Sequence, residues 1–226
     1  MNRIIKPELL DELPPEDPRA IRSRRDLRRV NAWMGNHAIM ATALAQHFPR
    51  APKRITELGA GDGHFLLRIA EKINWQNPDA TLLDRQSIVA GGTLAGFVRR
   101  GWRAEAVAAD AFAWLQGGNS SDIIIANLFL HHFENDRLAQ LFQGISERVR
   151  LFVAVEPHRF ALPFLCSQLL RLIGCNAVTR HDAAVSIRAG FVGSEISALW
   201  PDKSNWQMEE RRAGLFSHLF VARKNA

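Results

Sequence analysis

Residues 55–69 carry the pattern that most constrains how this chain folds. A short apolar strand, Ile55-Thr-Glu-Leu58, runs directly into Gly59-Ala-Gly-Asp-Gly63 and then into a helical stretch. Glycines permit positive backbone φ angles and let a ligand approach where a Cβ atom would collide. The G-x-G-x-G spacing is not the G-x-G-x-x-G dinucleotide fingerprint, and no G-K-[S/T] phosphate loop follows. The pattern therefore predicts a ligand-binding turn at the carboxyl edge of an open α/β sheet.

From Arg54 onward the sequence alternates between strand-like and helical stretches. Apolar runs occur at 55–58, 81–84, 106–110, 123–128 and 151–155, with helical patterns at 64–73, 86–100, 111–116 and 134–149. An apolar helix at 161–173, a short helix at 194–200 and two strands at 205–212 and 215–223 follow. Such alternation favours right-handed crossovers and a mainly parallel sheet. We expect a doubly wound, Rossmann-like α/β fold of seven strands with helices on both faces and a hairpin-like ending.

The N-terminal region lacks this alternation of strands and helices. Residues 1–22 predict an extended, proline-punctuated arm, and residues 24–48 predict one long helix that ends before Pro49. Its apolar positions recur every three or four residues: Leu27, Val30, Met34, Ala38, Ala41, Leu44, Ala45 and Phe48. We therefore expect residues 1–50 to form an arm and a capping helix, and residues 51–226 to form the α/β domain.

Polar residues stand at the ends of the predicted strands. Asp84 closes the second strand, Asp110 the third and Asn127 the fourth. A carboxylate at Asp84 can accept both hydroxyl protons of a ribose, and one at Asp110 can accept from an adenine amino group. Each acid taken alone is equally consistent with a helix cap. Together they predict one crevice lined by polar groups.

With these motifs in place, the sequence resembles the class I S-adenosylmethionine-dependent methyltransferases. The likeness covers residues 54–157, and such domains finish with an antiparallel strand pair. The resemblance implies a methionine-side loop at Gly59, Ala60, Gly61 and Gly63, a ribose contact at Asp84, and adenine contacts at Asp110 and Ala111. It also assigns Glu57 to the methionine amino group and places Asn127 at the cofactor. The implied cofactor is S-adenosylmethionine and the product S-adenosylhomocysteine.

The stretch that follows the fourth strand, Leu130-His-His-Phe133, contains candidate catalytic groups. This motif resembles the one found in small-molecule methyltransferases of quinone and polyketide pathways. His131 and His132 are candidates to orient or deprotonate an acceptor hydroxyl, although loop support or surface exposure explains them equally well. His181 is a further candidate for this pocket. The sequence holds no H-x-x-H motif and no cysteine or acidic cluster, so no metal site is predicted.

The acceptor pocket is expected between the N-terminal helix and the segment at 158–191. Candidate substrate-binding residues are Asn31, Trp33, His158 and Arg159, and Arg188 to Phe191 is expected to form a loop that closes over the pocket. An aromatic, quinone-like or polyketide-like acceptor is expected, with O-methylation favoured over C-methylation. Two alternatives stay open: an RNA or protein methyltransferase, and a non-catalytic protein that binds S-adenosylmethionine.

Composition limits the partners. The net charge of +6 would suit a nucleic-acid partner, yet the arginine cluster at 19–29 follows an acidic run that largely cancels it. The chain has no tyrosine and no aromatic-interleaved basic strand for stacking bases, so a nucleic acid is not the expected partner. There is no signal-like apolar run at the start and no apolar stretch of membrane-spanning length. We expect a soluble, cytoplasmic monomer or homodimer that acts on a small molecule.

Overall fold

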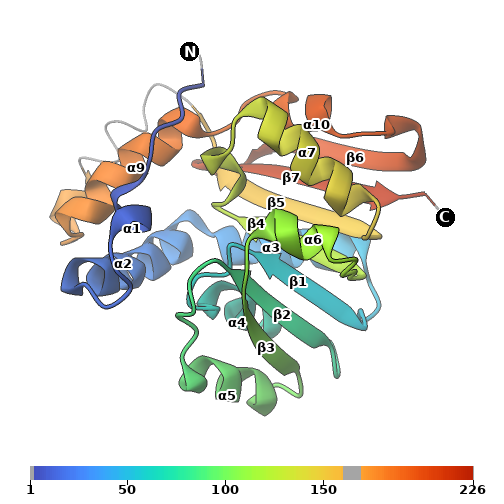
Figure 1. Cartoon of the computed structure of the whole chain (residues 1–226), viewed down its shortest axis with the longest axis horizontal. Helices are drawn as coiled ribbons and strands as arrows, with labels where there is room; N and C mark the ends of the chain where they lie inside the picture. Colours follow the sequence, from blue (N-terminus) through green and yellow to red (C-terminus); the bar gives the residue numbers. More distant parts are fainter. Residues whose placement is uncertain (1–2, 160–168, 226) are drawn as a thin grey trace.

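The computed structural model describes residues 3–159 and 169–225, and a seven-stranded sheet organises them (Figure 1). The strands are β1 (Arg54–Leu58), β2 (Asp79–Asp84), β3 (Arg103–Ala108), β4 (Ile123–Asn127), β5 (Leu151–Pro157), β6 (Trp206–Ala213) and β7 (Ser217–Lys224). Their order is β3-β2-β1-β4-β5-β7-β6, and β7 runs antiparallel to both of its neighbours. The predicted Rossmann-like, mainly parallel fold is confirmed.

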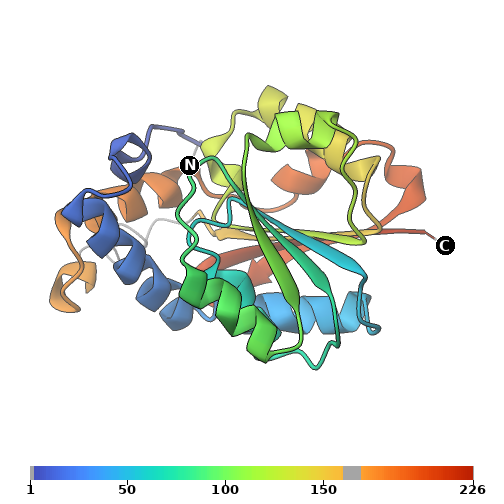
Figure 2. The same ribbon diagram turned by 60° about the horizontal axis from the view of Figure 1, so that its bottom comes forward.

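Helices cover both faces of the sheet (Figure 2). The helices α3 (Asn36–His47), α4 (His64–Ala70) and α5 (Gly91–Arg99) pack on one face, and α6 (Ala111–Gln116), α7 (Asn135–Ser146) and α10 (Glu195–Leu199) pack on the other. Strand β4 shows the cause. Because successive strand side chains point to opposite faces, Ile123 and Ile125 enter the first core while Ile124 and Ala126 enter the second. All four are fully buried.

A third group of helices lies beside the carboxyl ends of the parallel strands. These are α1 (Leu9–Glu12), α2 (Pro18–Met34) and α9 (Ala177–Ala189), which stand together at one end of the sheet (Figure 1). Short 3₁₀ turns at Leu130–His132 and Lys203–Asn205 complete the regular structure. The described residues contain no helix long and apolar enough to cross a membrane.

The prediction of a single helix over residues 24–48 is wrong. The chain forms α2 and α3 instead, broken at Gly35, whose φ of 73° lies in the left-handed region. Glycine is the residue that adopts this conformation without a steric cost, so it ends one helix and begins the next. The arm is also less extended than expected. It contains α1, and α2 begins at Pro18 behind Asp17, whose carboxylate accepts the Arg19 amide hydrogen at 2.8 Å.

The segment at 158–191 also departs from the prediction. Residues 177–189 form α9, a helix that the sequence pattern did not indicate. The expected closing loop is wrong: Arg188 belongs to the last turn of α9, and Phe191 is buried in the core. The predicted helix at 161–173 falls mostly outside the described residues. Helix α5 starts at Gly91, five residues later than expected.

Candidate functional site

A cavity of about 1120 Å³ lies at the carboxyl ends of β1, β2 and β4. Its walls come from the glycine-rich loop, the ends of these strands, helix α2 and residues 5–11 of the N-terminal arm. In a doubly wound sheet this edge is where ligands bind, because the crossover helices diverge there and leave a crevice. Nine residues implied or predicted at the cofactor lie together on its walls or loop: Glu57, Gly59, Ala60, Gly61, Asp84, Asp110, Ala111 and Asn127 line the cavity, and Gly63 closes the loop.

The glycine-rich loop has the geometry that its sequence predicts. Gly59, Gly61 and Gly63 all have positive φ angles, of 67°, 54° and 72°. A Cβ at Gly59 would stand 2.4 Å from the Phe129 ring, and one at Gly63 would stand 2.6 Å from Leu82. At Gly61 a Cβ would meet no protein atom within 4 Å, although this residue lines the cavity. Gly59 and Gly63 are therefore needed because a side chain there would collide with neighbouring residues. Gly61 instead leaves cavity space that a side chain would fill.

Glu57 is a buried carboxyl group on the cavity wall. Its side chain comes from β1 and is 2% exposed, and its Oε2 accepts no hydrogen bond from the described residues. Burial raises the pKa of Glu57 well above its usual range. A buried carboxyl oxygen without a partner is costly unless a ligand supplies one. A cationic group in the cavity would satisfy it.

Asp84 is fixed by the backbone on both sides. Its Oδ2 accepts from the Gly61 amide and its Oδ1 from the Gln86 amide, both at 2.8 Å. These bonds tie the end of β2 to the glycine-rich loop and hold the carboxylate at the cavity. Each oxygen keeps further acceptor capacity, since a carboxylate has about four lone-pair sites.

Asp110 caps a helix and also lines the cavity. Its Oδ1 caps α6 by accepting from the amides of Phe112 at 2.9 Å and Ala113 at 3.2 Å. The residue also lines the cavity next to Ala111. Capping therefore occupies one carboxylate oxygen and fixes the direction of the group.

Asn127 joins the strand end to the N-terminal helices. Its Nδ2 donates to Asn31 Oδ1, and its Oδ1 accepts from Asn36 Nδ2, both at 3.0 Å. Asn36 Oδ1 in turn accepts from Ser217 Oγ at 2.6 Å. This buried amide network holds the break between α2 and α3 against β4. Asn31, predicted at the acceptor, also lines the cavity.

The structure separates the other predicted acceptor residues from the cavity. Trp33 is 56% exposed and stacks on Phe216 with ring centroids 4.5 Å apart. Arg159 is buried and donates to the Gly190 carbonyl and to Glu195. The His158 ring stacks on His218 with centroids 5.8 Å apart. Among the described residues that line the cavity, none of these three occurs.

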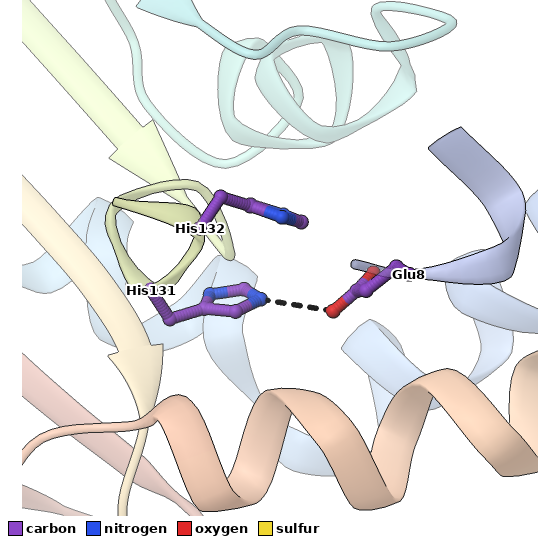
Figure 3. Close-up of side chains that lie close together, drawn as sticks. All are labelled: Glu8, His131 and His132. Atoms are coloured by element: carbon purple, nitrogen blue, oxygen red, sulfur yellow. Dashed lines mark hydrogen bonds and ion pairs between the residues drawn. The ribbon is translucent and has the colours of Figure 1, made fainter. Parts of the chain in front are cut away.

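His131 lies between the carboxylates of Glu8 and Glu156, and Figure 3 shows its contact with Glu8. Its Nδ1 is 2.8 Å from Glu156 Oε2, and its Nε2 is 3.2 Å from Glu8 Oε1. Burial lowers the pKa of His131, but the bonds and charges of these two partners outweigh it and raise the pKa to about 9. The same contact brings the pKa of Glu8 down to about 2 against the effect of burial. His131 therefore ties the arm to the loop after β4.

His132 faces the cavity instead. It lines the wall, and its Nδ1 stands 3.5 Å from Asp11 Oδ2. Burial and the positive charge of His131 lower the pKa of His132. The two adjacent histidines thus differ in position and charge, which their sequence does not reveal. His181 lies outside this group, with its Nδ1 3.0 Å from Asp182.

Sequence reasoning missed the arm as part of the site. Glu8 and Asp11 line the cavity and reach the two histidines, yet they lie in a stretch whose only signal is acidity and proline. Contacts across more than a hundred residues leave no local pattern. The sequence pattern also does not assign Lys6, Arg24 and Arg28, which are among the arginines and lysines of the same wall, to the site.

Comparisons with known proteins find similarity to methyltransferases. Residues 55–150 match a family model described as a methyltransferase domain. Trans-aconitate 2-methyltransferase of Streptomyces avermitilis is 30% identical over 162 residues, which cover 66% of this chain and 58% of that protein, less than two thirds of its length. The plantazolicin methyltransferase BpumL, solved in complex with SAH, superposes with a TM-score of 0.64 at 12% identity, covering 93% of this chain and 92% of that one.

A third similar structure is an O-methyltransferase family protein from Burkholderia thailandensis. It has a TM-score of 0.62 at 16% identity and covers 93% of this chain and 61% of that one. At such identities the two structural likenesses establish a shared fold.

Proposed function

We propose that this chain, which belongs to the class I S-adenosylmethionine-dependent methyltransferases, transfers a methyl group from S-adenosylmethionine to a hydroxyl group of a small organic acceptor. The observation that carries the proposal is the unpartnered, buried Oε2 of Glu57 on the cavity wall. It suits the ammonium group of the cofactor's methionine end. The glycine-rich loop beside it leaves room that a Cβ at Gly61 would fill.

The remaining cofactor contacts follow from the same wall. Asp84 would hold the ribose hydroxyls, and Asp110 with Ala111 would hold the adenine. Gly59, Ala60, Gly61 and Gly63 shape the backbone under the methionine end, and Asn127 holds the wall itself in place. When bound, S-adenosylmethionine supplies a sulfonium methyl group that a nucleophile can attack in line. The protein's contribution is to align the acceptor and exclude water.

We assign the acceptor oxygen to the end of the cavity where His132 lies, with His131 behind it and Asn31 on the opposite helix. Apolar side chains from Leu27, Phe129 and Phe133 line the cavity as well. This lining suits a flat aromatic, quinone-like or polyketide-like acceptor that carries a phenol or enol hydroxyl.

A second acceptor class rests on a separate observation. Lys6, Arg24 and Arg28 line the same cavity, and the relative from Streptomyces is named for an acid, trans-aconitate. Cationic side chains there would hold an acceptor carboxylate. Acidic acceptors therefore belong in the same assay as phenolic ones.

Calorimetric titration with S-adenosylmethionine and S-adenosylhomocysteine tests the proposal first. We expect one-to-one binding that Asp84→Ala weakens by about 1.5–3 kcal/mol, the scale of a lost charged hydrogen bond. Asp79→Ala is the matched control, since Asp79 begins the same strand and pairs with Arg103 on the surface. Absence of cofactor binding by the wild-type chain would overturn the proposal.

Turnover is then measured as S-adenosylhomocysteine formed with phenolic, enolic and carboxylic acceptors. RNA and protein acceptors serve as comparison, and methylation of those alone would contradict the small-molecule assignment. Cytoplasmic location and a monomeric or homodimeric state remain predictions from the sequence.

A further inference from the structure

Three potential metal ligands from distant parts of the chain meet at the acceptor end of the cavity. Glu8 of the arm and the adjacent His131 and His132 each offer a ligand atom, and these atoms lie within 4.8 Å of one another. Figure 3 shows both rings directed toward Glu8. Glu8 and His131 are 123 positions apart in the sequence. Folding, not local spacing, assembles the group, which explains why no metal motif is visible in the sequence.

The separation of the first two ligand atoms suits a shared ion. His131 Nε2 and Glu8 Oε1 are 3.2 Å apart. Zinc binds nitrogen and oxygen ligands at about 2.0–2.2 Å, which places neighbouring ligand atoms roughly 3–3.5 Å from each other. The ligand atom of His132 lies within 4.8 Å of both, and a closer approach of this ring would complete a set of two imidazoles and one carboxylate.

Outer carboxylates orient both histidines as they do at metal sites. His131 Nδ1 is bonded to Glu156 Oε2, which directs Nε2 toward Glu8. Glu156 is itself fixed by the amides of Phe129 at 2.9 Å and Leu130 at 2.8 Å. Such a carboxylate–histidine pair sets the tautomer and raises the basicity of the ligand nitrogen. Asp11 stands in the equivalent place beside His132, at 3.5 Å.

Charge and burial favour a cation at this place. Three carboxylates, those of Glu8, Asp11 and Glu156, surround the two imidazoles. The Glu156 side chain is fully buried and that of Glu8 is 12% exposed, so solvent screens these two negative charges little, whereas the Asp11 side chain is 61% exposed. A divalent ion would compensate them more completely than one proton on His131.

We propose that Glu8, His131 and His132 bind a divalent transition-metal ion, with Zn²⁺ as the best match to the ligand set. Three protein ligands leave one position open. Because Glu8 and His132 line the cavity, that position faces the acceptor. A hydroxyl oxygen bound there would lose its proton more easily. This role rests on the proposed methyl transfer, whereas metal binding itself does not.

The test uses the full chain, freed of metal by a chelator and then titrated with Zn²⁺ and with Co²⁺ as a spectroscopic probe. We expect one ion per chain and a visible ligand-field spectrum of nitrogen- and oxygen-bound Co²⁺. Glu8→Gln and His132→Gln each remove a ligand and should abolish stoichiometric binding. Glu156→Gln, which changes only the outer shell, should weaken it 10–100-fold.

A matched control is available in a second histidine–glutamate pair. His47 Nε2 and Glu209 Oε2 are also 3.2 Å apart, but His47 belongs to no group of three ligands among the described residues. His47→Gln should leave Co²⁺ binding unchanged. Circular dichroism and cofactor titration of every variant report whether it is folded.

Two results would overturn the metal site. One is the absence of stoichiometric binding by the wild-type chain, and the other is binding that survives Glu8→Gln and His132→Gln together. Either would leave His131 as a protonated tie between Glu8 and Glu156. Co²⁺ binding in a chain that binds no S-adenosylmethionine would instead contradict the proposed function and leave the metal site standing.

Discussion

Glu57 is the buried carboxyl group on the cavity wall that we propose binds the cofactor's ammonium group. Burial raises the pKa of this carboxyl group, so the free protein holds it protonated at pH values where an exposed glutamate is charged. A cationic partner favours the charged form. We therefore predict that S-adenosylmethionine binding releases a proton from Glu57, and that affinity rises as the pH rises through the elevated pKa.

Calorimetry in buffers of different ionisation enthalpy measures that proton directly. Glu57→Gln should abolish the buffer dependence and weaken binding by about 1.5–3 kcal/mol. Glu105→Gln on the exposed face of β3 is the control. A wild-type binding enthalpy that is identical in all buffers would contradict the prediction.

The glycines of the loop separate stability from binding. Gly59→Ala brings a Cβ against the Phe129 ring and places an alanine at a positive φ angle, which is strained. We therefore expect a loss of about 2–4 kcal/mol in unfolding free energy. Gly61→Ala meets no protein atom and should lose only about 1–2 kcal/mol, but it should weaken cofactor binding at least tenfold.

Gly118→Ala is the control for backbone strain alone. Its φ is 78°, a Cβ there meets no atom within 4 Å, and it does not line the cavity. Urea unfolding and calorimetry of the three variants give both quantities. Unchanged cofactor affinity in Gly61→Ala would remove the loop from the site.

At this scale, what the sequence predicts depends on distance along the chain. The loop and Asp84 are recognisable because a strand end and its following turn are local features. The difference between His131 and His132 is not, because it depends on Glu8 and Asp11, which a distant arm supplies.

Among the elements, the arm is the part that local patterns describe least well. Its prolines suggest an extended chain, yet α1 forms because Asp182 of α9 accepts the amides of Leu9 at 2.8 Å and Leu10 at 3.0 Å. Helix termini need such partners, and here a distant side chain provides them. The α2–α3 break escapes prediction for a related reason: the apolar spacing continues across Gly35, and only the buried amide network of Asn31, Asn36 and Asn127 requires the turn.

We predict that Asp182→Ala releases the arm without unfolding the sheet. The variant leaves the two amides without their acceptor, at a cost of about 1–3 kcal/mol. Limited digestion with a glutamate-specific protease followed by mass spectrometry should show faster cleavage after Glu8 and Glu12, while circular dichroism stays unchanged. Asp202→Ala, on the surface of the C-terminal region, should digest like the wild type. Equal cleavage rates in both variants would mean that Asp182 does not hold the arm.

For the whole molecule, the alternation of strands and helices was enough to predict the fold. Parallel strands that are buried on both faces read as apolar runs, as in Ile123 to Ala126, and turn residues separate them from their helices. The pattern does not show where a domain begins, because α3 shares its core with the sheet. Met40 and Leu44 are fully buried in the same cluster as Ile55 and Val153.

Two truncations test how the N-terminal region contributes to the fold. A chain that starts at Asp17 loses the arm and α1 but keeps the cap of α2, and it should unfold cooperatively near the wild-type temperature. A chain that starts at Ala51 loses α3 and with it two fully buried apolar side chains, Met40 and Leu44, each worth about 1.5–3 kcal/mol. It also exposes the apolar face of β5. Because a domain is stable by only about 5–15 kcal/mol, the shorter chain should show no cooperative transition in thermal circular dichroism. Cooperative unfolding of the chain from Ala51 would instead show that residues 51–226 fold independently of the capping helix.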